Sequence, residues 1–538
     1  MAEPTSAGEM RRTLNLTGVT VNAMALIAPG AFLWTTFQTQ AALQRHGSST
    51  ANEMWTGLFF AFILAMLTAY SYAELARIYP QAGTGSTYYY AEAAFLDKER
   101  SHHQRYARFA KLSIGWVSHL YYWIYPGIMV AYIATLFGYI YLGMFHHQLT
   151  GVPIACIAVV FAGVVGYIAY RGIQGSTITA IIINVIQIVC LLGVSFMFIW
   201  FRLAHPHAGF EHSNGGSVII PHNYINMLYQ STIAILLLVG FESVTALGAE
   251  AKNPESDIKR GVLISLLIQG GICYLFEYFA ANYAIGAGTI AFKTSSGIET
   301  GYAAAADATK TSAPIGNMIQ NIAEHHLGHS GTTVSLIVAF TVLLALIGTT
   351  LSCVNTGVRV TYAMAKDKEM PSLLKLGHLH GEYATPYLSI LWMTIIAAAL
   401  GVFGSVPWQV DNLTQITLAS NIGTFMVYGA TCAIAFIAFA SRHDKHILKH
   451  MAIPGVGCIM NVLELAGVVY IALTGSGTSP GDAEKALGVV ILWCILGLVW
   501  VLMNPERHRN RSDVEAKNPE SDIKRGVLIS LLIQGGIC

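Results

Sequence analysis

The chain has 538 residues, of which 54% are apolar and only 11% are charged. Soluble domains carry about 25% charged residues, so this composition excludes an ordinary soluble fold. The 30 Lys and Arg and the 29 Asp and Glu give a net charge of +1, which leaves no cationic excess for binding nucleic acid. The remaining class is a membrane protein that crosses the bilayer several times.

Twelve apolar stretches are long enough to cross a bilayer as helices, which takes about 20 residues each. Their apolar residues are continuous, whereas the strands of a membrane barrel alternate with a period of two. We therefore predict an all-α integral membrane protein with twelve transmembrane helices. The predicted spans are Leu14–Phe37, Met54–Ala76, Ser113–Leu142, Val152–Tyr170, Thr177–Phe201, Ile225–Gly248, Gly261–Gly288, Thr333–Met364, Tyr387–Gly404, Gln415–Ala440, Ile453–Thr474 and Leu487–Met503.

Cationic residues predict the orientation, because Lys and Arg collect in cytoplasmic segments. Residues 1–13 are polar and no cleavage site follows them, so the first span is predicted to be an uncleaved anchor with this segment in the cytoplasm. We expect a protein of the cell membrane with both termini cytoplasmic. In this orientation the outer segments hold only Arg45, Arg202, Lys293, Lys310 and Lys485.

One sequence, EAKNPESDIKRGVLISLLIQGGIC, occurs twice, at 250–273 and at 515–538. The second copy lies in the tail, 504–538, and its apolar part is too short to cross a bilayer. Identity without any drift favours an artefact of cloning or of gene prediction. The alternative is a docking tail that mimics the seventh span, and the tail is left out of the fold prediction.

Two of the predicted spans are interrupted near the middle of the membrane. The first contains Ala28-Pro29-Gly30, and the sixth contains Val239-Gly240-Phe241-Glu242. Proline lacks an N–H and glycine loosens the backbone, so unpaired backbone groups there must be buried or line a cavity. Either interruption alone fits a kink or a close helix contact. Together they open two successive five-helix blocks, 14–203 and 225–441, ahead of the last two helices at 453–503, and this arrangement indicates a transporter site.

Three sequence blocks resemble known permeases. YAELARIYPQAGTGSTYYYAEAAF at 72–95 is similar to their helix 2–3 segment, and GFESVTALGAEAKNPESDIKRGV at 240–262 is similar to their helix 6 and the following loop. NTGVRVTYAMAKDKEMPSLL at 355–374, followed by Thr385-Pro386, is similar to their helix 8–9 connection. The chain thus resembles the amino acid–polyamine–organocation superfamily over all twelve predicted helices.

The resemblance implies the five-plus-five inverted-repeat fold of the sodium-coupled leucine transporters, with broken helices 1 and 6 around an amino acid or amine. A half-helix N-terminus offers N–H groups and partial positive charge to a substrate carboxylate, and carbonyls at the breaks would accept an ammonium group. The family usually has a glycine-rich sequence in helix 1, whereas here Ala28 and Pro29 precede a single Gly30. The predicted substrate-binding residues are Ala25, Ala28, Pro29, Gly30, Ala31, Phe32, Leu238, Val239, Gly240, Phe241 and Glu242.

Acidic residues inside the membrane are costly and point to function. Glu242 lies within the sixth-span interruption, and we predict that it couples proton movement to substrate. Its alternative role is a carboxylate that bonds the backbone of helix 1 or 6. Glu277 is the second predicted proton-coupling residue, and Glu464 is a further acid in the membrane. The alternative for both is a protonated carboxyl group hydrogen-bonded within the bundle.

Several aromatic residues accompany these acids. Phe241 is predicted to close over the substrate, with core packing as its alternative. Trp116, His119, Tyr121 and Tyr122 of the third span are candidates for the wall of the pathway, although such spacing is also typical of packing.

Some relatives carry a lysine in helix 5, where this chain has Asn184 and Gln187. A sodium site between helix 1 and hydroxyls such as Thr349, Thr350 or Ser352 therefore stays open, although such hydroxyls usually bond their own helix.

Charged residues at the cytoplasmic helix ends form a predicted inner gate. Its residues are Glu74, Arg77 and Arg359, with Asp367 beside them. The alternative is solvated charge at the helix ends.

These features predict a secondary active transporter that moves an amino acid or related amine by alternating access, through proton-coupled symport or exchange. The alternatives are a non-transporting amino acid sensor of the same fold and a sodium-coupled symporter. A Walker A sequence and the catalytic motif HExxH are missing, and we expect neither an ATP-driven pump nor an enzyme. We expect no cofactor and no metal site, and the oligomeric state stays open. One acid and no fixed Lys or Arg near the breaks favour neutral or cationic substrates.

Overall fold

The structure is a computed structural model. It describes residues 14–27, 29–79, 87–96, 104–172, 177–205, 218–247, 251–285, 290–294, 297–307, 314–328, 330–371, 374–380, 383, 385–406, 411–440, 442–443, 445–474 and 481–503. Ala28 and the tail at 504–538, with the second copy of the repeat, lie outside this set.

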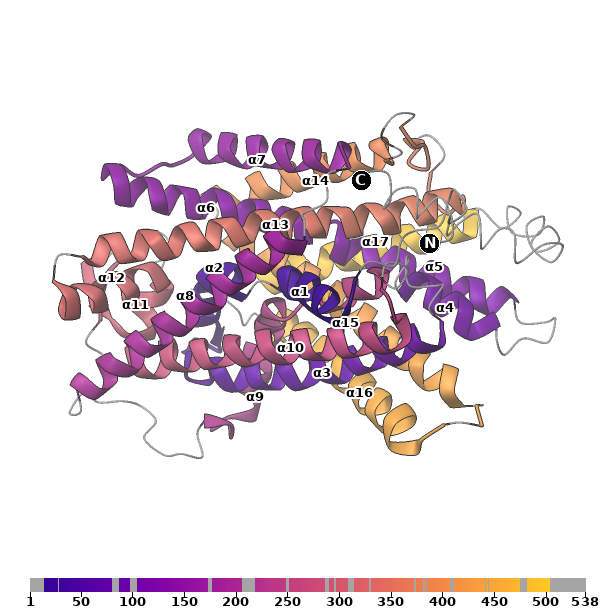
Figure 1. The fold of residues 1–538 in the computed structure, drawn as a ribbon, viewed down its shortest axis with the longest axis horizontal. Coiled ribbons are helices and arrows are strands. Elements are labelled where there is room, and N and C mark those ends of the chain that lie inside the picture. Colours follow the sequence, from indigo (N-terminus) through magenta and orange to yellow (C-terminus); the bar gives the residue numbers. More distant parts are fainter. Residues whose placement is uncertain are drawn as a thin grey trace, which may run out of the picture.

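The described chain is almost entirely helical, and most long helices run along the long direction of the molecule (Figure 1). The α-helices are α1 Leu16–Ile27, α2 Pro29–Ala42, α3 Met54–Ile78, α4 Thr87–Leu96, α5 Gln104–Tyr122, α6 Tyr125–Phe145, α7 Val152–Tyr170, α8 Thr177–Ala204, α9 Tyr224–Ala234, α10 Pro254–Tyr278, α11 Gly301–Asp307, α12 Pro314–Leu327, α13 Gly331–Lys366, α14 Tyr387–Ser405, α15 Asp411–Ala440, α16 Ile453–Thr474 and α17 Asp482–Met503.

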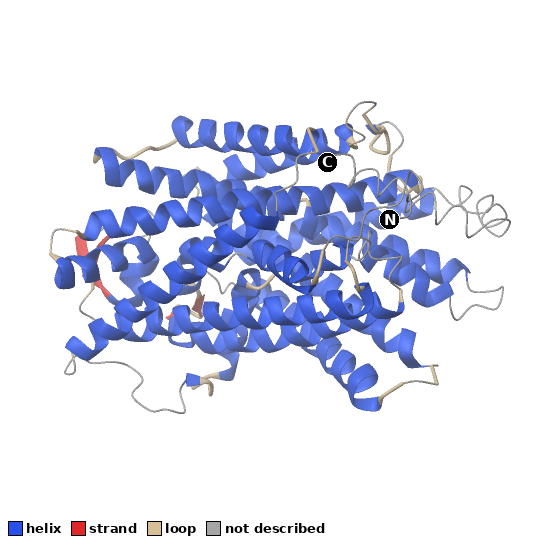
Figure 2. Cartoon of the chain, in the orientation of Figure 1, coloured by secondary structure: helices blue, strands red, loops and turns tan. Residues whose placement is uncertain are grey.

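Short elements join these helices. The 3-10 helices used below are η1 Ala51–Glu53, η4 Ile235–Leu237 and η5 Phe241–Leu247, and the π-helices are η6 Phe279–Ala284 and η11 Ile447–Ala452. Two antiparallel hairpins pair β1 Gln44–Arg45 with β2 Ser48–Ser49, and β3 Ala291–Thr294 with β4 Gly297–Thr300 (Figure 2).

Ten helical segments in the described part of the chain are long and apolar enough to cross a membrane. They coincide with ten of the twelve predicted spans. The other two predicted spans are not among these ten segments. Residues of the first lie in α1 and α2, with Ala28 outside the described residues, and the sixth passes from α9 through η4 to η5.

The third predicted span is one helical segment of membrane length, Phe109–Phe145, with a turn inside it that the sequence did not predict. Helix α5 ends at Tyr122 and α6 begins at Tyr125, with a turn at Trp123 and Ile124 between them. Pro126 lies at the start of α6, where its missing N–H would otherwise continue the helical ladder. The proline therefore accounts for the turn.

Helix α1 lies in the middle of the bundle (Figure 1). It packs against α8, α10, α13 and η5, while α6, α7 and α14 pack together on one side and α3, α9, α10 and α16 on another. Large apolar side chains such as Val160, Phe196 and Leu473 are more than half exposed on α7, α8 and α16. Such surfaces fit contact with lipid, because a soluble protein rarely exposes apolar patches of this size.

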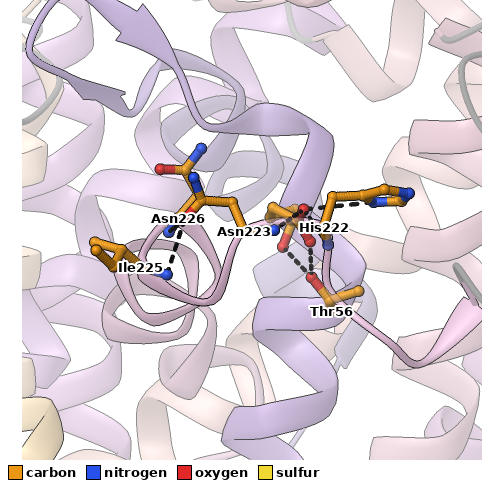
Figure 3. Close-up of polar contacts among 6 residues, drawn as sticks. Thr56, His222, Asn223, Ile225 and Asn226 are labelled. Carbon is orange, nitrogen blue, oxygen red and sulfur yellow. Dashed lines mark hydrogen bonds and ion pairs between the residues drawn. The ribbon is translucent and has the colours of Figure 1, made fainter.

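The start of α9 is fixed by two side chains (Figure 3). The Asn223 side chain accepts hydrogen bonds from the backbone N–H groups of Ile225 and Asn226, at 3.0 and 3.1 Å, as an N-cap. The fully buried Glu53 carboxylate accepts from the N–H groups of His222 and Asn223, at 2.8 and 3.0 Å, and from the Thr56 hydroxyl. These bonds fix where α9 begins and hold its first turn against the start of α3.

Candidate functional site

The backbone between α9 and η5 is unwound around Gly240. This residue has a φ of +118°, a conformation that glycine adopts without steric cost. Its carbonyl accepts from Ser243, through the backbone N–H at 3.2 Å and through the hydroxyl at 2.5 Å. Its N–H donates to Glu242 Oε2 at 3.1 Å. The polar groups released by the turn are thus paired locally, as a buried interruption requires.

Glu242 is 1% exposed and accepts hydrogen bonds from two tyrosines. The Tyr121 hydroxyl on α5 donates to Oε1 at 2.8 Å, and the Tyr428 hydroxyl on α15 donates to Oε2 at 2.9 Å. With the Gly240 N–H, this carboxyl group joins three elements. It therefore has the backbone-bonding role that the sequence left as an alternative.

Glu242 also faces a narrow cavity, where its carboxyl group could contact a bound molecule. The cavity is lined by Tyr121, Tyr122, Tyr125, Gly240, Glu242, Ser243, Cys353 and Thr356. These residues come from the end of α5, the start of α6, the unwound segment and α13. A hydrogen-bonded carboxyl group beside hydroxyl groups can exchange a proton with a bound molecule or bind an ammonium group.

The other residues predicted from the sixth span are buried but lie outside this lining. Leu238, Val239 and Phe241 are 0% exposed. The Phe241 ring packs against the rings of Tyr72 and Tyr428, with centroids 6.1 and 5.3 Å apart. In this structure Phe241 makes the packing contacts of the core.

The residues predicted from the first span are only partly described. Ala28 lies outside the described residues, as do the side chains of Ala25, Pro29, Ala31 and Phe32. Gly30 is buried, and a Cβ there would lie 3.0 Å from the Gln187 amide nitrogen. Gly30 therefore lets α2 approach α8 closely.

Two buried amides, Asn184 on α8 and Gln269 on α10, bond the backbone of α1. Asn184 donates to the Val21 carbonyl at 3.2 Å, and Gln269 on α10 donates to the Met24 carbonyl at 3.2 Å and to Asn184 at 3.0 Å. On α13, the hydroxyls of Thr349 and Thr350 donate to their own helix backbone.

Glu277 lies in a separate buried network and not in the cavity lining. Its Oε1 accepts from the Gln40 side chain on α2 at 2.9 Å. The Gln230 side chain on α9 donates to the Gln40 carbonyl at 2.9 Å and to the Thr50 hydroxyl at 2.8 Å. Glu277 is thereby connected to α2, in the first predicted span, and to α9, in the sixth.

Trp116 and His119 lie in an aromatic cluster on another face of α5. The Trp116 ring stacks on Trp493 of α17 at 4.8 Å, and each indole N–H donates to the other residue's carbonyl. The His119 ring lies 4.4 Å from Trp123. Of the four predicted wall residues, only Tyr121 and Tyr122 line the cavity.

Two of the three predicted gate residues meet at one end of the bundle. Glu74 is 2% exposed and pairs with Arg77 at 2.8 Å and with Lys259 at the start of α10. The His450 ring nitrogen of η11 lies 3.5 Å from the same carboxylate. Arg359 lies half-buried on α13. Glu74, Arg77, Lys259 and His450 form what we call the Glu74 cluster, which connects α3 with α10 and η11.

A second ionic cluster is centred on Lys111. Lys111 on α5 pairs with Glu92 of α4 at 2.6 Å and with Asp367 after α13 at 2.7 Å. Burial, and then the nearby Asp367 carboxylate, raise the pKa of Tyr88 on α4 well above its usual value, so its hydroxyl stays neutral and donates to Asp367 at 2.9 Å. Lys111, Glu92, Asp367 and Tyr88 form what we call the Lys111 cluster. Sequence spacing could not reveal it, because its members are far apart in the chain.

The family model for amino acid permeases matches residues 18–511. The chain belongs to the amino acid permease family. A low-affinity putrescine importer, PlaP of Escherichia coli, is 23% identical over 91% of this chain and 95% of its own length. The branched-chain amino acid permease BcaP of Bacillus subtilis is 24% identical over 86% of this chain and 88% of its own length.

A solved structure has a similar fold. The crystal structure of MhsT in complex with L-phenylalanine aligns with a TM-score of 0.56 at 11% identity, covering 85% of this chain and 99% of that one. At this identity the likeness concerns the fold alone.

Proposed function

We propose that this permease is a secondary active transporter that moves an amino acid or related amine by alternating access, with Glu242 carrying the coupled proton. The observation that supports this most strongly is the placement of Glu242. It is a buried carboxyl group in an interrupted helix, faces the cavity, and is bonded to α5 of the first five-helix block and α15 of the second. Acids placed in this way inside a membrane are typical of coupling sites.

The proposed architecture has twelve spans. The ten long helices are joined by two divided spans, α1 with α2 and α9 with η4 and η5. The spans form the two inverted repeats, 14–203 and 225–441, with both termini on the cytoplasmic side of the cell membrane. The Glu74 and Lys111 clusters then lie on the cytoplasmic side and close the inner path.

The proposed substrate is neutral or cationic. Among the described residues that line the cavity there is one acid, and the others are tyrosine, glycine, serine, cysteine and threonine. A substrate with a second carboxylate would place two negative charges together without a cation. The names of PlaP and BcaP, which refer to putrescine and to branched-chain amino acids, fit this choice.

Coupling to protons is proposed in preference to sodium. The hydroxyls of Thr349 and Thr350 donate to their own helix, which gives them a structural role. Glu277 is the second proposed proton-coupling residue, because its network reaches both α2 and α9.

A ligand screen followed by counterflow tests the transport function. Purified protein is scanned for an increase in melting temperature with amino acids and amines, because a ligand that binds only the folded state stabilises it. We expect neutral or cationic compounds to stabilise the protein and then to exchange across proteoliposomes loaded with the same compound. Binding without counterflow would instead favour a sensor.

A further inference from the structure

Three successive polar residues on α9 fasten this half-helix to three other parts of the bundle. Gln230, Ser231 and Thr232 are each 0% exposed. Gln230 bonds Gln40 and Thr50, as described above. The Ser231 hydroxyl lies within hydrogen-bond distance of two acceptors, Glu464 Oε1 of α16 at 2.5 Å and the Leu228 carbonyl of its own helix at 2.8 Å. The Thr232 carbonyl accepts from Asn421 of α15 at 2.7 Å.

Around Glu464 there is a surplus of acceptor oxygens. Glu464 is 1% exposed, and its Oε2 has no hydrogen-bond donor within the described residues. The same holds for the amide oxygens of Asn461 and Asn421, which are at most 1% exposed. Asn461 lies one turn before Glu464 on the same face of α16, because residues three apart are neighbours on a helix.

The charge of Glu464 is also not balanced by a cation. Among the described residues, no ion pair reaches this carboxyl group. The elements packed against α16 are α3, α9, α15, α17 and η11. The charged groups of these elements lie at the helix ends. His450 is 14 residues before Glu464, which corresponds to about 20 Å along the helix axis at 1.5 Å per residue. The described titratable side chains on these elements and on α16 are Tyr70, Tyr72, Glu74, Arg77, Tyr224, Tyr229, Tyr428, Cys432, Lys449, His450, Cys458, Tyr470, Asp482, Glu484, Lys485 and Cys494.

We propose that Glu464 and Ser231 form a second proton-binding site, outside the substrate cavity and at the contact between α9 and α16. A proton on Oε2 turns one acceptor into a donor, in a region where buried acceptor oxygens outnumber the donors. It also neutralises a carboxylate whose burial as an unpaired charge is costly. The Ser231 hydroxyl then serves the other oxygen of the same carboxyl group.

The proton affinity of this site would depend on the position of α9. The Ser231–Glu464 bond joins the half-helix that leads into the Gly240 turn to a helix beyond the two repeats. Movement of α9 would break that bond and change the proton affinity of Glu464. Only this linkage to α9 rests on the proposed function, because proton binding at Glu464 requires no transport.

Infrared difference spectroscopy of the purified protein through a pH titration tests the site directly. A protonated carboxyl group absorbs in its carbonyl stretch, and we expect Glu464→Gln to lose one component of the titrating band. Ser231→Ala should keep that component and shift its midpoint, because one oxygen loses its donor. The matched control is Ser195→Ala, which removes a buried hydroxyl that donates to Leu191 of its own helix and should leave the titration unchanged.

A titrating band that is the same in wild type and Glu464→Gln would overturn the proposal. If Glu464→Gln fails to fold, the Ser231→Ala titration decides, and a midpoint equal to that of Ser195→Ala would contradict the site. Failure of wild-type counterflow would overturn the proposed function and leave the infrared result standing, so the two outcomes are distinguishable.

Discussion

At the scale of single residues, Glu242 both bonds two helices and lines the cavity. Its two tyrosine donors come from different five-helix blocks, so the carboxyl group ties the two halves together at the cavity. A bound amine or a proton would compete with these donors for the same oxygens. This competition is a direct way for occupancy of the cavity to affect helix packing.

The Tyr428 hydroxyl provides one test of this role. Tyr428→Phe leaves one oxygen of a buried carboxyl group with a donor fewer, and we expect it to lower the free energy of unfolding by about 1–3 kcal/mol. Thermal unfolding in detergent measures the loss. Tyr229→Phe is the matched control, because the buried Tyr229 hydroxyl has no hydrogen-bond partner among the described residues. Equal melting temperatures for the two variants would show that the Tyr428–Glu242 bond contributes nothing.

At the scale of elements, the unwound segment after α9 depends on Gly240. Gly240→Ala places a Cβ at a φ of +118°, and we expect a cost of about 1–3 kcal/mol. Gly271→Ala on α10 is the control, because its Cβ would meet nothing within 4 Å and alanine favours a helix by about 0.5–1 kcal/mol. Opposite shifts in melting temperature are expected, and a neutral Gly240→Ala would contradict the unwound geometry.

The Lys111 cluster joins α4, α5 and the end of α13, and removing its ammonium should loosen that side of the molecule. Breaking a buried ion pair by removing one partner costs about 3–5 kcal/mol. We therefore expect Lys111→Met to open the cavity toward this side and to raise the labelling rate of Cys353, which lines the cavity, by about tenfold or more. The measurement uses an impermeant thiol reagent and protein in which Cys353 is the single cysteine.

Lys445→Met is the control for this experiment, because Lys445 is exposed and its ammonium donates only to the Ala440 carbonyl among the contacts described. Unchanged labelling in Lys111→Met would rule out the cluster as a closing contact.

The sequence predicted the elements better than the contacts. Continuous apolar runs predicted ten spans that the structure has as long helical segments, and Gly240 marked the turn in the sixth span. The turn at Trp123 was not predicted. Pro126 marks its position in the sequence, but a proline in a membrane helix often causes only a kink. Tyr125 and Cys353 line the cavity, but nothing in their local sequence separates them from core residues. Long-range pairs such as Lys111 with Asp367 depend on how the helices pack.

At the scale of the whole molecule, the few charged residues are unevenly distributed. Ionic side chains gather in the Glu74 and Lys111 clusters, while the acids Glu242, Glu277 and Glu464 lie buried within the predicted spans, each held by neutral donors. This separation suits a transporter. Ion pairs that can open and close stand at one end, and carboxyl groups that can change their protonation lie along the bundle.

The most direct test of proton coupling at Glu242 is substrate accumulation in proteoliposomes driven by a proton gradient, with a substrate found in the thermal screen. Wild-type protein is predicted to concentrate the substrate when the gradient is imposed and to stop when the gradient is collapsed. Glu242→Gln keeps the shape of the side chain without the charge, and it is predicted to lose gradient-driven accumulation. Full gradient-driven accumulation in Glu242→Gln would contradict proton coupling at this residue.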